Sequence, residues 1–79
     1  MAAKKQKSDL EVYEQDIKSG AVMYSACIFF NGRNNSIRYS TLQEAQEMAA
    51  KMTLAANNGR KGIVYAVDEQ GRATFVSSH

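Results

Sequence analysis

The sequence predicts an α+β fold in which a four-stranded, largely antiparallel sheet packs on one long amphipathic helix. Three observations predict it. Residues 41–58 repeat apolar side chains at the helical period, two pairs of short apolar runs flank turn-forming residues, and a capping signal precedes a shorter helix over 9–18. The predicted order of elements is α-β-β-α-β-β.

The first helix is expected over residues 9–18. Ser8 and Glu11 have the spacing of a capping box, and Gly20 is a typical stop signal. Val12 lies off the apolar face, which leaves a strand as the alternative for this segment. The residues that share the apolar face are Leu10, Tyr13 and Ile17.

The first hairpin is expected around the dipeptide Asn31-Gly32, which favours a two-residue type I′ turn. The preceding run, 21–30, is apolar on both faces and therefore predicts a central strand. With the short turn, Phe30 pairs with Arg33. A longer loop through Asn35 would shift the register by one residue and move the next strand's side chains to the other face.

The second helix is expected over 41–58. Thr41 and Glu44 have the spacing of a second capping box, and Gly59 is the predicted stop. The apolar face is narrow and made of small or flexible residues, which lets a helix approach a sheet closely. Its members are Leu42, Ala45, Ala49, Met52 and Ala56, with Met48 and Ala55 beside them.

The second hairpin is expected from strands over 63–67 and 72–76, joined by a turn that ends in Gly71. In this hairpin Tyr65 faces Phe75. We expect a flexible basic tail over residues 1–7, a single domain over 8–77 and fraying of residues 78–79. The order of the strands in the sheet does not follow from the sequence.

Composition excludes several classes of protein. A chain of 79 residues forms one domain with a thin core. One Cys and one His provide neither an internal disulfide nor a structural zinc site, so we expect no metal and no cofactor. Without a signal peptide or a membrane-length apolar run, the chain is expected to be cytoplasmic, with no membrane partner.

Catalytic signals are weak. Cys27 lies within an apolar strand, where an inert thiol is expected, and His79 is the last residue. The sequence contains no phosphate-binding glycine loop and no nucleophile elbow. We therefore expect a protein that is not an enzyme.

The predicted topology places two Asn-Gly-Arg loops at one end of the sheet. Their basic and amide side chains suit phosphates or an acidic protein surface. The alternative is that these residues serve only as turn formers and helix ends. The candidate binding residues are Asn31, Arg33, Asn34, Asn58, Arg60 and Lys61.

The first functional hypothesis is a non-catalytic protein-binding module that regulates or inhibits a larger protein machine. A homodimer is expected because the strand that ends in Phe29-Phe30 and the C-terminal hairpin both supply edges for pairing. The alternative is a nucleic-acid-binding protein that uses the same loops and the basic tail. The net charge of +2 does not decide between them. The aromatic signal for nucleic acid is only Phe29 beside Arg38, and we expect Phe29 to pack under the first helix.

Overall fold

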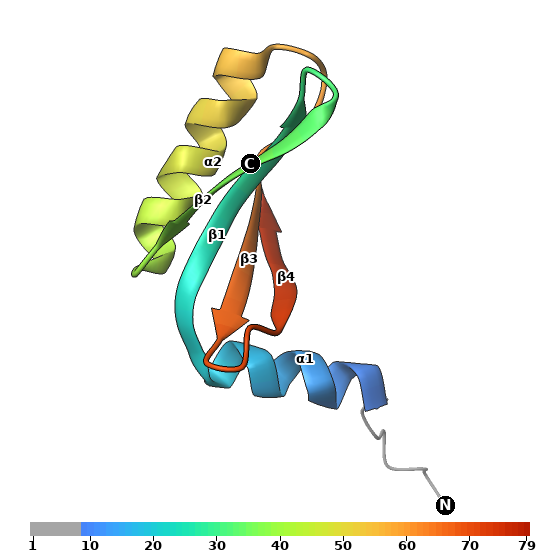
Figure 1. Cartoon of the computed structure of the whole chain (residues 1–79), viewed down its shortest axis with the longest axis vertical. Coiled ribbons are helices and arrows are strands. Elements are labelled where there is room, and N and C mark those ends of the chain that lie inside the picture. The colour runs from blue at the N-terminus through green and yellow to red at the C-terminus, as the bar shows by residue number, and fades with distance from the viewer. Residues whose placement is uncertain (1–8) are drawn as a thin grey trace, which may run out of the picture.

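The computed structural model describes residues 9–79, and its elements follow the predicted order (Figure 1). The predicted basic tail and Ser8, the first residue of the expected capping box, lie outside the described residues. The elements are α1 (Asp9–Ser19), β1 (Ala21–Phe30), β2 (Arg33–Tyr39), α2 (Leu42–Ala56), β3 (Ile63–Asp68) and β4 (Ala73–Ser78). The α+β class is confirmed.

The four strands form one antiparallel sheet in the order β2-β1-β3-β4, so β1 is central as predicted. The first turn is short: Asn31 and Gly32 both have positive φ, at 58° and 78°, and Phe30 pairs with Arg33. In the second hairpin Tyr65 pairs with Phe75. Both predicted registers are therefore present, and the longer loop is excluded.

Strand β4 continues into the segment for which we expected fraying. Ser78 pairs with Ile63, and the backbone amide of His79 donates to the carbonyl of Gly62 at 2.8 Å. The loop before β3 supplies this acceptor, so the backbone groups at the end of the chain find partners that the sequence pattern did not indicate.

Helix α2 begins as predicted and ends two residues early. The hydroxyl oxygen of Thr41 accepts from the Glu44 amide at 3.3 Å, while the hydroxyl donates to the Glu44 carboxylate at 2.8 Å. At the other end Asn57 takes the left-handed conformation, with φ of 46°, and its amide bonds the Thr53 carbonyl. Asn adopts this conformation more readily than most residues, so it closes the helix before Gly59.

The core lies where α2 approaches the central strands. Ala45 and Ala49 of the helix and Ala26 and Val64 of the sheet are completely buried. The approach is closest at Gly62, where an added Cβ would lie 2.7 Å from the carbonyl carbon of Ala49 and nearer still to its oxygen. Small residues on both sides therefore set the distance between helix and sheet.

Helix α1 lies across the lower end of the sheet, far from the Asn31-Gly32 turn, and contacts β3 and β4 (Figure 1). Only Ile17 of its predicted apolar face is buried. Leu10 is 64% exposed and Tyr13 46% exposed. The helix therefore does not cover Phe29, which is 40% exposed, and that expectation is wrong.

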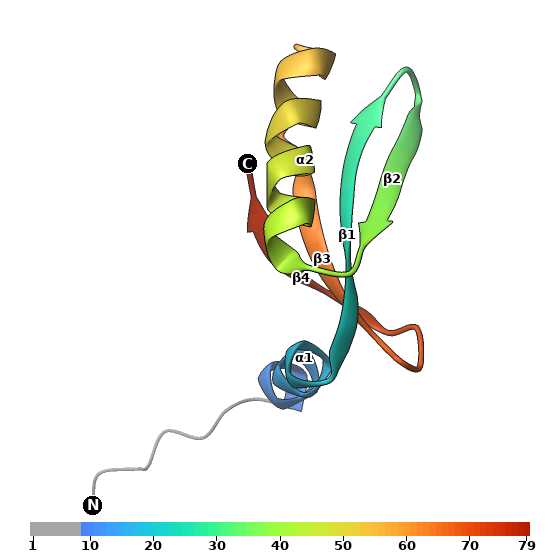
Figure 2. The same cartoon turned by 90° about the vertical axis from the view of Figure 1, so that its left-hand side faces the viewer.

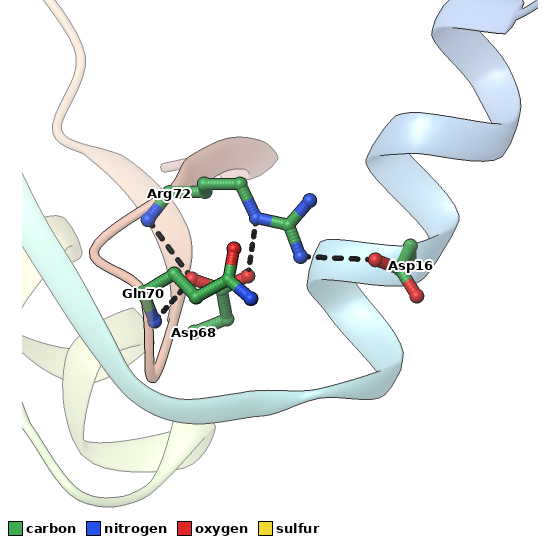
Figure 3. A network of polar contacts seen from close by, with 4 residues as sticks. All are labelled: Asp16, Asp68, Gln70 and Arg72. Atoms are coloured by element: carbon green, nitrogen blue, oxygen red, sulfur yellow. Dashed lines mark hydrogen bonds and ion pairs between the residues drawn. The ribbon is translucent and has the colours of Figure 1, made fainter.

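Charged groups attach α1 to the turn between β3 and β4 (Figure 3). The Asp68 carboxylate accepts from the backbone amide of Arg72 at 2.9 Å, from its Nε at 2.7 Å and from the amide of Gln70 at 3.0 Å. The Nη2 of Arg72 also donates to Asp16 of α1 at 2.9 Å. The Arg72 guanidinium also lies 5.3 Å from the centre of the half-exposed Tyr13 ring, so α1 meets this turn through a charge and a ring.

Candidate binding face

The face of the sheet opposite α2 is open, and we call it the open face. Because side chains alternate along a strand, the neighbours of the buried Ala26 and Val64 point away from α2. Figure 2 shows α2 lying along one side of β1 and β3. The pairing registers place these residues on the open face: Ser25, Cys27, Phe29, Asn34, Ser36, Ile63, Tyr65, Phe75 and Ser78.

The open face is hollowed into a shallow concavity of about 750 Å³. Its walls carry hydroxyl, amide and cationic groups around apolar side chains. None of the described residues that line it is Asp or Glu. The lining residues are Ser25, Cys27, Ile28, Phe29, Asn34, Ser36, Arg60, Lys61, Ile63, Tyr65 and Ser78.

An aromatic ring and a cation meet at the upper end of the concavity. The guanidinium carbon of Arg60 lies 4.8 Å from the centre of the Phe29 ring, within the range of a cation–π contact. Both side chains remain exposed. Phe29 thus presents a ring whose neighbour is a positive charge rather than core.

Asn58 joins the second Asn-Gly-Arg loop to β1, two residues before the first loop begins. Its side-chain nitrogen donates to the carbonyl of Phe29 at 3.1 Å, and its side-chain oxygen accepts from the amide of Arg60 at 3.1 Å. Both loops lie at the upper end of the molecule in Figure 1. Asn58 therefore positions Arg60, and its own side chain already has partners.

The six predicted binding residues do not all share one surface. Asn34 and Lys61 line the concavity beside Arg60. Asn31 forms the first turn through its left-handed backbone, and Arg33 is exposed at the start of β2. We call Arg33, Arg60 and Lys61 the basic rim.

Two further aromatic residues lie lower on the open face. Tyr65 and Phe75, from the adjacent strands β3 and β4, make an edge-to-face contact with ring centres 6.5 Å apart and planes at 83°. Phe75 is 50% exposed. The predicted pairing of these residues already implied that the rings would be neighbours. The sequence did not reveal that α1 and α2 leave them uncovered.

Cys27 lies in the floor of the concavity and is half-buried. Burial raises the pKa of its thiol, so little thiolate forms at neutral pH and the group is a weak nucleophile. Within residues 9–79, no three His, Cys, Asp or Glu side chains gather as they would to hold a metal ion. In the same part of the chain, no helix combines the length and apolar character needed to span a membrane.

Comparisons with protein-family models, with curated proteins and with solved structures gave no match.

Proposed function

We propose that the protein is a small, non-catalytic binding module whose interaction surface is the open face together with the basic rim. The observation that carries this proposal is the concavity on the open face. It is lined by cations, amides and hydroxyls, and its described lining residues include no carboxylate. Such a surface complements an anionic partner.

The same proposal holds that the protein binds its partner without catalysing a reaction. Cys27 lines the concavity, and its raised pKa opposes reactivity at neutral pH. Regulation or inhibition of a larger protein machine stays a prediction, because it depends on the identity of the partner. A cytoplasmic location also stays a prediction.

The proposal is tested by capture from lysate with matched variants. The double charge reversal R60E/K61E changes two exposed residues of the basic rim, and K18E/K51E changes two exposed lysines of α1 and α2. We expect the wild type and K18E/K51E to retain the same partner and R60E/K61E to lose it. The retained partner is then purified and titrated against all three proteins. Equal binding by all three would refute a role for the rim.

Association of two copies is a separate proposal. Strand β1, which ends in Phe29-Phe30, lies between β2 and β3, so it does not supply the edge that the sequence suggested. The edges are β2 and, in the C-terminal hairpin, β4, and a second chain can pair with an uncovered edge. Light scattering after size-exclusion chromatography measures the mass directly. A monomer at all accessible concentrations would contradict the dimer without affecting the proposed binding face.

A further inference from the structure

We infer that the ligand of the open face is single-stranded nucleic acid, held by base stacking on Phe29 and Tyr65 and by phosphate contacts to Arg60 and Lys61. This inference rests on the proposed function, because it names the ligand of the same surface. It is argued from three properties of the open face: its rings, its cations and its shape.

The rings favour nucleic acid over an acidic protein segment. An acidic peptide is recognised by cations, and it gains little from aromatic rings left exposed on a sheet. A nucleotide carries both a base with a π-face and a phosphate. The Arg60 guanidinium lies over the Phe29 ring, 4.8 Å from its centre, so a base that stacks on this face displaces the guanidinium, which is then beside the phosphate of the same strand.

The spacing of the rings favours several nucleotides in an extended strand. Phe29 lies on β1, and Tyr65 lies opposite Ser25 of the same strand, four residues away. At about 3.3 Å per residue this separation is about 13 Å along the strand. The edge-to-face contact with Phe75 fixes the Tyr65 ring at the lower end of the concavity.

The requirement for free base faces selects a single strand. In a duplex the bases are stacked on one another, so their faces do not reach a protein ring. Proteins that stack bases on aromatic residues bind unpaired nucleotides. The hydroxyl and amide groups that line the concavity can then bond the edges of the bases, and they come from Ser25, Asn34, Ser36 and Ser78.

Charge complementarity supports the same ligand. Arg60 and Lys61 lie beside the Phe29 ring, and Asn58 holds Arg60 there through its amide. Each phosphate neutralised by a cation releases a counterion, so affinity falls as salt rises. When log affinity is plotted against log salt concentration, two such contacts to a single strand contribute about −1.4 to the slope.

The test uses fluorescence anisotropy with 12-mers of dT and of U, and a 12-base-pair duplex, at about 50 mM salt. F29A is compared with F30A, because Phe30 is 39% exposed, next along the chain and on the other side of the sheet beside Met52. We expect binding of the single strands, a loss of roughly 10- to 100-fold in F29A and no loss in F30A. Thermal unfolding checks that both variants fold.

The charges are tested with R60Q/K61Q against K18Q/K51Q. The first pair is expected to reduce the magnitude of the salt slope by about 1.4 and the second to leave it unchanged.

A measurement that needs no variant is the rate at which Cys27 is alkylated. A bound oligonucleotide should slow this reaction, because Cys27 lines the concavity.

The outcomes separate this inference from the proposed function. Stronger binding of the duplex, or equal losses in F29A and F30A, would overturn base stacking. No binding of any oligonucleotide, together with a purified acidic protein partner that R60E/K61E fails to bind, would overturn the nucleic-acid ligand and leave the binding face in place. If neither kind of partner binds, both proposals fail.

Discussion

Replacement of Gly62 by Ala tests how closely α2 approaches the sheet. Gly62 does not have a positive φ, so the new methyl group meets no backbone restriction, only a lack of space. Its Cβ would lie 2.7 Å from the carbonyl carbon and 2.8 Å from the Cα of Ala49. Both are backbone atoms of a helix, so no side-chain rotation can relieve the contact.

The cost follows from the two ways in which the structure can respond. Overpacking of a core costs about 1–3 kcal/mol. Moving β3 away from α2 instead weakens the 2.7 Å hydrogen bond from the Gly62 amide to the Thr53 hydroxyl oxygen, which contributes about 0.5–1.5 kcal/mol. Because either response is unfavourable, we expect G62A to lower the free energy of unfolding by about 1–3 kcal/mol, and the midpoint temperature by about 4–8 °C for each kcal/mol in a domain of this size.

The matched control is Gly20→Ala. A Cβ at Gly20 would lie 3.5 Å from the carbonyl oxygen of Asp16, which is an ordinary contact, and this glycine also lacks a positive φ. Alanine there reduces the entropy of the unfolded chain, so G20A is expected to be neutral or more stable by up to about 1 kcal/mol. Circular dichroism during thermal and urea unfolding measures both variants. A G62A midpoint within a few degrees of that of G20A would refute the close approach.

Three further predictions concern single groups. Thr53→Val keeps the side-chain shape but leaves the buried amide of Gly62 without its acceptor. Urea unfolding should show that the free energy of unfolding falls by about 1–3 kcal/mol. An unchanged midpoint would mean that another group accepts the hydrogen bond of this amide. Burial alone would raise the pKa of Asp68, but the amide and guanidinium of Arg72 outweigh it and hold the pKa below the usual 3.8. The Asp68 carboxylate therefore stabilises the fold above that pH, and this stabilisation is lost as the pH falls through the depressed folded value. Asp68→Asn should be less stable at neutral pH and should lose less stability on acidification, and parallel acid-unfolding curves for the two proteins would contradict this. Because the pKa of Cys27 is raised above 9.0, its reaction with iodoacetamide should be slow at neutral pH and should accelerate in alkaline solution, and rapid labelling at neutral pH would contradict the burial.

The hairpins were predictable because their turns carry specific chemistry. Asn31-Gly32 needs two positive φ angles, and once that turn is short the pairing of Phe30 with Arg33 follows. The second register follows in the same way from the turn that ends at Gly71. Local residues therefore determined local pairing in both hairpins.

The arrangement of larger pieces was not predictable from local residues. The periodicity of α1 shows which of its sides is apolar but not which part of the sheet it meets, and only Ile17 is buried there. The ring of Tyr13 lies beside Arg72 instead of in the core. With α1 at the lower end of the sheet, Phe29 is left exposed. The sequence offered this ring as an aromatic signal for nucleic acid, but the expected cover by the first helix had discounted it.

The position of the candidate site could be predicted from the sequence, but the role of each of its residues could not. Chain direction alone placed the two Asn-Gly-Arg loops at one end, and the bond from Asn58 to the Phe29 carbonyl joins the second loop to the end of β1 that leads into the first. The functional role of each residue did not follow. Asn58 is used to hold the second loop on β1, and the importance of Gly62 depends on Ala49, which is distant in the sequence.

The strand order β2-β1-β3-β4 has a consequence for the rate of folding. Each outer ladder joins neighbours in sequence and can form early as a hairpin, on a timescale of about 1–10 μs. The central ladder pairs Cys27 with Ile63, so it closes a loop that contains all of β2 and α2. Joining the two hairpins is therefore the slow step, because the entropy of that loop must be lost before its contacts form. Stopped-flow refolding of G62A should consequently show slower folding as well as faster unfolding, since its clash with Ala49 lies between α2, inside that loop, and the start of β3.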